Sequence, residues 1–225
     1  MKFIWRLVAV FIPVIVFSGC SGDGDSGNAN PSGPQSSYAV HASPLGPPPF
    51  GCNPPGAATL AVMQKLNAFW QSGVQACSCD VVTLANGCAH NGFVHPTGVG
   101  YIFYDSAFLD ILDAQGSTLP ADFFMAHEFG HNIQLVLGLN PPGKIRELQA
   151  DCLGGFYVGF QARSGQVTQA DVMSTFQFSC SIGDPFLSNW WDSSHGTCSE
   201  RVSALQQGFN GYFAGNLPGE ACPSP

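Results

Sequence analysis

Charged residues are scarce in this sequence, and cations are the scarcest of them. Lys and Arg number 7 and Asp and Glu number 15 in 225 residues, which gives a formal net charge of −8. A chain with so few cations lacks the basic surface by which proteins bind nucleic acids and anionic membranes. We therefore expect neither of them as a partner. Internal repeats of solenoid length are also lacking.

The sequence has one apolar run at its N-terminus and lacks a second run that would span a membrane. Lys2 and Arg6 precede the apolar residues 7–17, a stretch shorter than the roughly 20 residues of a spanning helix. Gly, Ser, Asp and Asn follow it in place of a cluster of positive charge. This layout is typical of an export signal, so we assign residues 1–19 to a signal peptide.

The end of this segment, "VFSGC", resembles the lipobox of bacterial lipoproteins, and by that resemblance Cys20 is the lipid-anchored residue. Residues 20–42 are expected to form the anchor and a flexible linker, because 21–37 contain no apolar residue larger than Ala or Pro. Residues 43–225 form the folded domain. We expect a location in the bacterial cell envelope, with membrane contact through the lipid alone. Cleavage near Gly19 by ordinary signal peptidase would give a secreted protein instead.

Eight cysteines remain after Cys20, an even number in an exported chain, and this predicts disulfides. The sequence leaves their connectivity open, although Cys77 and Cys79 are too close in sequence to pair readily with each other. A structural zinc site at Cys77, Cys79 and Cys88 is the alternative, but it lacks a second suitably spaced pair.

Hydrophobic periodicity and turn signals predict an α+β fold that is mainly helical, with a small β-sheet. Expected helices cover 57–72, then 118–138 with Thr118 as N-cap, and 142–162. Two capping boxes, Thr168 with Asp171 and Thr197 with Glu200, start helices at 169–180 and 198–213. Short strands are expected at 80–85 and 100–109.

The stretch "FFMAHEFGHNIQ" places His127 and His131 four residues apart on the predicted helix at 118–138. Residues four apart lie on one helical face, so both rings can reach one ion, while Glu128 lies beside them and is free to act as a base. This HExxH pattern predicts a zinc site. The alternative is an ordinary buried helix with hydrogen-bonded histidines, which would be costly without a metal or partners.

A catalytic zinc ion needs a third protein ligand, and the next helix offers two carboxylates in "ELQAD". Glu147 and Asp151 share one face, so one can bind the metal while the other accepts a histidine N–H group. The chain has only four glutamates, and two of them, Glu128 and Glu147, fall on these two helices where a metal site would need them. The alternative for Glu147 is a surface ion pair with Lys144 or Arg146.

The segments "AHEFGHNIQ", "ELQADCLGGFYVG", "GD" at 183–184 and "HGT" with "ERVSALQQGF" at 195–209 occur in the order of the bacterial neutral zinc metallopeptidase family. This family belongs with the gluzincin-like peptidases, and the resemblance covers about residues 84–213. It implies a zincin-like fold, with one Zn²⁺ bound by His127, His131 and Glu147. It also implies that Glu128 is the general base and that Asp151 orients a ligand.

The sequence departs from the family in two places. His95 precedes a proline where the family often has a cysteine, so the disulfide pairing around Cys88 is open. The family's "GDD" is "GDP" at residues 183–185. Neither departure involves an expected metal ligand.

These residues predict a zinc metalloendopeptidase that hydrolyses peptide bonds in the envelope, with Glu128 accepting a proton from a zinc-activated water. A peptide or protein is the expected substrate. We expect His195, with Tyr157 behind it, to stabilise the oxyanion, unless His195 is only a surface or capping residue. Trp190 and Trp191 could wall the pocket or only cap the core. Residues 101–108 could form an edge strand that holds a peptide or, equally, a strand of the core.

Two further hypotheses concern packing and function. Gly130, Gly154 and Gly155 are expected to allow close approach of the two metal-bearing helices. The alternative function is a non-catalytic zinc-binding or structural lipoprotein that acts in binding or assembly. Glu128 argues against it, because a structural zinc site has no use for a base.

Overall fold

The computed structural model describes residues 46–48, 52–78, 92–94, 99–139, 141–184 and 195–223. By the contacts within each part, the chain divides into two units, Met1–Asn30 and Pro31–Pro225. Every described residue lies in the second unit. The expected signal peptide at 1–19, the anchor Cys20, the linker at 20–42 and the strand at 80–85 lie outside the described residues.

Helices dominate the described chain and a small sheet accompanies them, as the sequence predicts. The helices are α1 (Ala57–Trp70), α2 (Ser106–Asp113), α3 (Leu119–Val136), α4 (Gly143–Arg163), α5 (Gln169–Ser181), α6 (Cys198–Phe213) and α7 (Pro218–Ala221). The strands are β1 (Gln75–Ser78), β2 (Gly92–Phe93) and β3 (Tyr101–Tyr104). Both predicted capping boxes are present, at the first residues of α5 and α6.

The sheet has the order β1-β3-β2, with β1 parallel and β2 antiparallel to β3. The predicted strand at 100–109 is right only for its first half. It ends at Tyr104 because the Asp105 side chain accepts hydrogen bonds from the N–H groups of Ala107 and Phe108, which caps α2. Because β3 is the middle strand of the described sheet and all four of its residues are buried, the edge-strand alternative for residues 101–108 is wrong and the core-strand alternative is right for Tyr101–Tyr104.

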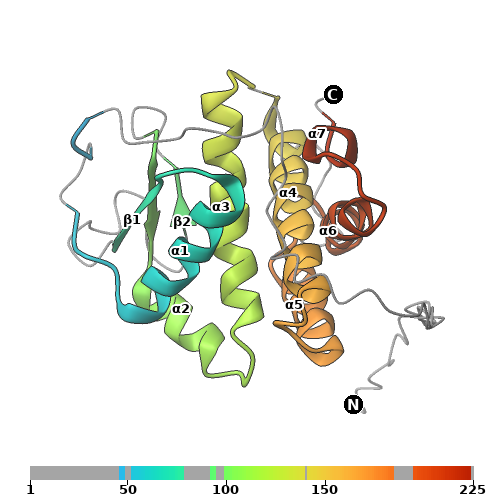
Figure 1. Cartoon of the computed structure of the whole chain (residues 1–225), viewed down its shortest axis with the longest axis horizontal. Helices are drawn as coiled ribbons and strands as arrows, with labels where there is room; N and C mark the ends of the chain where they lie inside the picture. The colour runs from blue at the N-terminus through green and yellow to red at the C-terminus, as the bar shows by residue number, and fades with distance from the viewer. Residues whose placement is uncertain are drawn as a thin grey trace, which may run out of the picture. The chain divides into compact units, whose positions relative to one another are not determined.

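Helix α3 runs between the sheet and α4, and α6 packs on the other side of α4 (Figure 1). A Cβ atom at Gly130 would lie 3.0 Å from the Cα atom of Ala150, and one at Gly154 would lie 2.9 Å from the Phe123 ring. These two glycines therefore allow α3 and α4 to approach closely, as predicted. The same expectation is wrong for Gly155, which faces the backbone of α6.

Close contact between α4 and α6 also depends on Gly208. A Cβ atom at Gly208 would collide with the carbonyl oxygen of Cys152, and one at Gly155 would collide with that of Leu205. The two backbones therefore touch without intervening side chains. The largest fully buried side chains come from α1, β3, α3 and α4, and they are Trp70, Tyr104, Tyr157, Phe103, Phe123, Phe129 and Phe156.

Disulfides join Cys52 to Cys77, Cys152 to Cys222 and Cys180 to Cys198. The prediction of a disulfide-stabilised domain is thus confirmed, and it is consistent with an extracytoplasmic location. The alternative zinc site is contradicted, because the thiolate that Cys77 would need is consumed in a disulfide. Cys79 and Cys88 lie outside the described residues.

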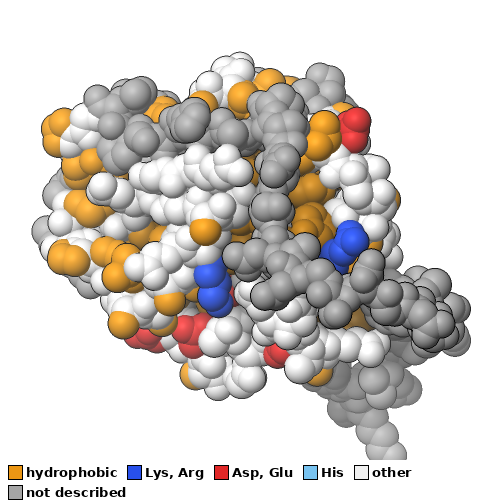
Figure 2. Space-filling model, in the orientation of Figure 1, with side chains coloured by type: hydrophobic (Ala, Val, Ile, Leu, Met, Phe, Trp, Pro, Cys, Tyr) orange, Lys and Arg blue, Asp and Glu red, His pale blue; other side chains and the backbone are white. Residues whose placement is uncertain are grey.

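Few charged side chains appear on the face drawn in Figure 2, and they are scattered among apolar and neutral ones. This agrees with the low charge content of the sequence, 10% Asp, Glu, Lys and Arg. Within the described ranges, no helix combines the length and the hydropathy that crossing a membrane requires.

Candidate metal centre

The site is built on α3, whose position against the sheet is fixed by a buried asparagine. Asn132 Oδ1 accepts a hydrogen bond of 2.7 Å from Gly100 N, and its Nδ2 donates to Tyr101 O at 3.2 Å. Thr118 precedes the helix as predicted, but its side chain makes no capping hydrogen bond. These two hydrogen bonds fix the orientation of α3 relative to the sheet, and with it the directions in which the histidines and Glu128 project.

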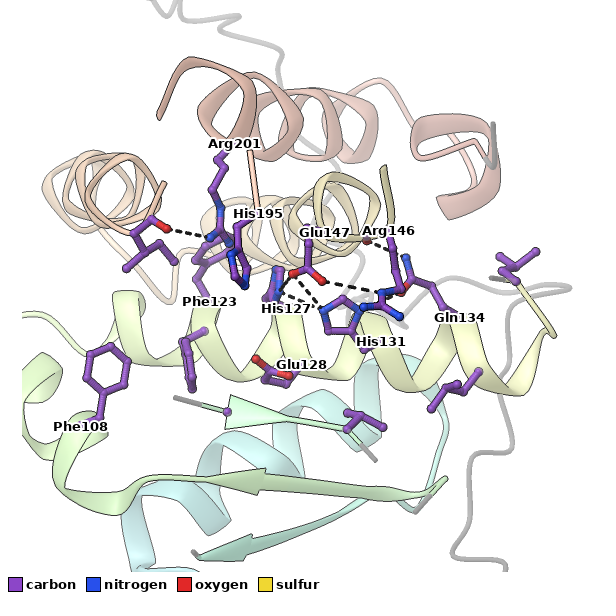
Figure 3. A pocket seen from close by; sticks show the side chains of 16 residues that line it. Phe108, Phe123, His127, Glu128, His131, Gln134, Arg146, Glu147, His195 and Arg201 are labelled. Carbon is purple, nitrogen blue, oxygen red and sulfur yellow. Dashed lines mark hydrogen bonds and ion pairs between the residues drawn. The ribbon is translucent and has the colours of Figure 1, made fainter. Parts of the chain in front are cut away.

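His127, His131 and Glu147 converge on one point between α3 and α4 (Figure 3). The two Nε2 atoms are 3.2 Å apart, and they lie 3.3 and 3.4 Å from Glu147 Oε2. Ligands of a tetrahedral zinc ion at about 2.0–2.1 Å are separated from one another by ~3.3–3.4 Å. The three atoms therefore fit one face of such a coordination sphere, although the identity of the metal does not follow from them.

Asp151 lies behind His127. Its Oδ1 atom is 2.8 Å from His127 Nδ1, as the four-residue spacing from Glu147 predicts for a carboxylate that orients a ligand. Arg201 from α6 donates to both oxygens of Asp151, at 2.8 Å from Nε and 2.7 Å from Nη2. Its Nη1 also donates to Ile182 O at 3.2 Å. All of these side chains are buried, so the carboxylate is neutralised inside the fold.

Sequence reasoning missed Arg201. A signal for it exists, because Arg201 is in step with Leu205, Gly208 and Phe209 on the buried stripe of α6. A cation on an apolar stripe requires a buried anion as its partner. Sequence reasoning also missed Gln134, whose Oε1 atom lies 2.8 Å from His131 Nδ1. Its signal is the three-residue spacing from His131, which places both on one helical face.

Carboxylates make this point favourable for a cation. Burial acts to lower the pKa of His127, but the charge and hydrogen bond of Asp151, the hydrogen bond of Glu147 and the charge of Glu128 raise it to about 10. Burial acts to raise the pKa of Glu147, but hydrogen bonds and positive charge from His127 and His131 hold it well below its usual range. A metal ion would supply the positive charge that these groups favour.

Glu128 lies on the side of α3 that faces β2, apart from the three converging side chains (Figure 3). A Cβ atom at Gly92 would lie 3.0 Å from Glu128 Cγ and 2.9 Å from the Phe124 ring, so the strand requires glycine here to pass so close to the helix. The Oε2 atom is buried and has no hydrogen-bond partner among the described residues. Burial raises the pKa of Glu128, which suits a group that accepts a proton.

A cavity of about 660 Å³ opens over these groups. Apolar side chains line one part of it, including Val94, Phe108, Phe123, Phe124 and Ile182. Arg146 and His195 lie on opposite sides of the group formed by His127, His131 and Glu147 (Figure 3). The surface ion pair expected as an alternative for Glu147 exists as a loose contact of 3.7 Å with Arg146 Nε, whereas Lys144 pairs with Glu200 at 2.8 Å.

His195 lines the cavity, and about half of its side chain is exposed. Its backbone N–H donates to Asp184 Oδ2 at 2.9 Å, and its Nδ1 lies 3.7 Å from Asp184 Oδ1. Tyr157, which was expected behind it, is instead in the core, where its hydroxyl accepts a hydrogen bond from Gln161. That expectation is wrong because Tyr157 faces α1, where it packs on Phe69. Trp190 and Trp191 lie outside the described residues.

Comparison with known proteins finds distant homology to "Uncharacterized protein YpfJ" of Escherichia coli K12, with 28% identity over 148 residues. The YpfJ protein of Escherichia coli O6:H1 matches equally. The match covers 55% of this chain and 49% of the relative, so the chain spans about half the length of the curated relatives it matches. No family model and no solved structure matches. The relative's name gives no activity, so the comparison establishes kinship without a function.

Proposed function

We propose that this protein is a zinc-dependent metallopeptidase that cleaves peptide bonds. The observation that carries the proposal is that a candidate set of metal ligands and a separate buried carboxylate line the same cavity. His127, His131 and Glu147 form a group that could hold a metal. Glu128 lines the same cavity from the side of α3 that faces β2, and its buried Oε2 atom has no hydrogen-bond partner among the described residues. A purely structural site would have no use for such a base next to an open cavity.

Each residue has a role in the proposed reaction. A zinc ion held by the three side chains would act as a Lewis acid toward water and toward the substrate carbonyl. Glu128 accepts a proton from the attacking water as the new C–O bond forms. It passes this proton to the leaving nitrogen as the C–N bond breaks. Asp151 keeps the His127 ring in place, and Arg201 keeps Asp151 in place.

His195 is the proposed donor to the oxyanion that develops on the substrate. Its place on the cavity wall and its contact with Asp184 support this role. Within the described sheet, β2 is an edge strand that passes next to Glu128, and an extended peptide could align along it. The apolar side chains of the cavity suit an apolar residue of that peptide.

We further propose that the enzyme acts in the cell envelope, held by a lipid on Cys20. The disulfides support an oxidising compartment. The low content of Lys and Arg supports a peptide or protein substrate, rather than a nucleic acid.

The test uses the purified full chain with its disulfides intact. We expect about one zinc ion per chain, hydrolysis of a peptide library, and loss of hydrolysis on chelation. Glu128→Gln should keep the zinc and lose activity by about 10²–10⁴-fold, because the proton acceptor is gone. Glu220→Gln on α7 makes the same change away from the cavity, and this variant should keep both the zinc ion and the hydrolytic activity. Zinc binding with no hydrolysis by the parent would reject the peptidase and favour the alternative, a zinc-binding factor.

A further inference from the structure

Two buried glutamines stand behind His131. Gln134 is 1% exposed and Gln149 is 7% exposed. Gln134 Nε2 donates to the carbonyl oxygen of Arg146 at 2.8 Å and to Gln149 Oε1 at 3.0 Å. Gln149 Nε2 donates in turn to the carbonyl oxygen of Cys222 at 3.4 Å. The chain of hydrogen bonds thus runs from the metal-binding group to the C-terminal segment, where Cys222 is fixed by its disulfide to Cys152.

The direction of every bond in this chain is determined by its backbone ends. A backbone carbonyl can only accept, so an amide nitrogen has to face Arg146 O and another has to face Cys222 O. Gln149 therefore presents its oxygen to Gln134, and Gln134 presents its oxygen to His131. Reversing the Gln134 amide would place its oxygen against two acceptors. The reversed arrangement is excluded on that ground.

An oxygen acceptor beside Nδ1 of His131 requires that this nitrogen carries the proton of the neutral ring. The Nε2 atom of His131 then has a free lone pair, and it faces Nε2 of His127 and Oε2 of Glu147. Nδ1 of His127 likewise faces an oxygen acceptor, Oδ1 of Asp151, whose carboxylate is paired with Arg201. Both histidines thus have an oxygen acceptor at Nδ1. For His127 the acceptor is a charged carboxylate, and for His131 it is a neutral amide.

We propose that Gln134 is a positioning residue that fixes the tautomer and ring orientation of His131 for metal binding, and that Gln149 in turn fixes Gln134. The neutral amide does this without adding a further negative charge to a group already surrounded by Asp151, Glu147 and Glu128. The proposal rests on the metal-binding part of the proposed function and is independent of hydrolysis.

The test compares Gln134→Leu with Gln161→Leu in the oxidised full chain. Gln161 is a matched control, because it is another buried glutamine whose amide donates two hydrogen bonds, to Asp122 and Tyr157. Zinc affinity is measured by competition with a chromogenic chelator. We expect a loss of about 10–100-fold for Gln134→Leu and parent affinity for Gln161→Leu. The zinc affinity of Gln149→Leu should lie between that of the parent and that of Gln134→Leu.

A second measurement reports the tautomer of His131 directly, and it requires neither bound metal nor enzymatic activity. Nitrogen-15 NMR of the histidine rings in the metal-free parent, at a pH where the His131 ring is neutral, should show its proton on Nδ1. In Gln134→Leu the Nε2-protonated form should appear beside it. Only the proposed role predicts this change, since a general loss of stability would not shift one tautomer.

Either of two results would overturn the proposal. They are a folded Gln134→Leu protein with the parent's zinc affinity, and a parent whose His131 carries its proton on Nε2. If Gln134→Leu does not fold, Gln149→Leu and the parent's tautomer still decide the question. A chain that binds zinc with this dependence but cleaves no peptide would refute the peptidase and leave the role of Gln134 supported.

Discussion

His127 Nδ1 lies 2.8 Å from Oδ1 of Asp151, and the carboxylate is completely buried. Arg201 donates hydrogen bonds to both oxygens of that carboxylate. A side chain of α3 is therefore oriented by α4, and the orienting side chain is neutralised by α6. The arrangement of His127, His131 and Glu147 thus depends on how three helices pack, and this dependence can be measured.

Removal of Arg201 should leave a buried, uncompensated charge on Asp151. We expect Arg201→Leu to lower the free energy of unfolding by about 3–5 kcal/mol. Lys144→Ala breaks the partly exposed ion pair with Glu200 and should cost less than about 1 kcal/mol. Urea denaturation of the metal-free proteins measures both. Equal losses in the two variants would show that burial of the Asp151–Arg201 pair has no special weight.

Zinc should stabilise the folded chain, because the three ligand atoms are brought together only by folding. At a free zinc concentration 100 times the Kd, the free energy of unfolding should rise by about 2.7 kcal/mol. Thermal unfolding with and without zinc measures the shift. Glu147→Ala should lose it, and Glu220→Ala should keep it. A full shift in Glu147→Ala would remove Glu147 from the ligand set.

Gly208→Ala should force α6 away from α4, because its Cβ atom would collide with the carbonyl oxygen of Cys152. We expect a net loss of about 1–3 kcal/mol, even though alanine favours a helix over glycine by roughly 1 kcal/mol. Gly46→Ala is the control, since a Cβ atom there meets nothing within 4 Å. Chemical denaturation compares them. A stabilised Gly208→Ala protein would mean that the two helices adjust freely.

Asp122 should make stability depend on pH. It is buried in the first turn of α3, and this burial raises its pKa. A hydrogen bond from Gln161 and the charge of Lys65 lower the pKa in part, while the charge of Asp113 raises it further. The folded state thus holds the proton more tightly than the unfolded chain, so the free energy of unfolding falls as pH rises from the ordinary pKa to the raised one.

Asp122→Asn keeps an acceptor for Gln161 but does not ionise. The stability of this variant relative to the parent should therefore increase with pH through that window and stay constant above it. Denaturation midpoints of the two metal-free proteins across a pH series measure this difference. A difference that does not change with pH would contradict the raised pKa of Asp122.

Local patterns predicted much of this structure well. The capping boxes gave the first residues of α5 and α6, and the HExxH spacing gave the shared face of His127 and His131. These features depend on interactions within one turn of helix, which the sequence specifies directly. The strand at 100–109 was predicted too long, because a cap at Asp105 overrides the β-propensity of the residues that follow it.

Contacts between helices could not be predicted in the same way. Residue spacing left open which of Glu147 and Asp151 joins the histidines, since both lie on one face of α4, and only the family resemblance pointed to Glu147. Because α4 packs against α3 on one side and α6 on the other, Glu147 lies near both histidines, whereas Asp151 lies between His127 and Arg201. The glycines that allow this crossing are far apart in sequence, Gly130 and Gly154 between α3 and α4 and Gly155 and Gly208 between α4 and α6.

The sequence by itself therefore determined the helices, the shared face of the two histidines, the glutamate next to His127 and an even set of cysteines. Tertiary structure placed Glu147 with the histidines, which residue spacing had not decided. Tertiary structure alone decided that Arg201 compensates the charge of Asp151, that Gln134 lies behind His131, and which described cysteines pair. The reason is physical. Spacing along a helix fixes neighbours within it, whereas partners on different helices depend on how closely the backbones can pack.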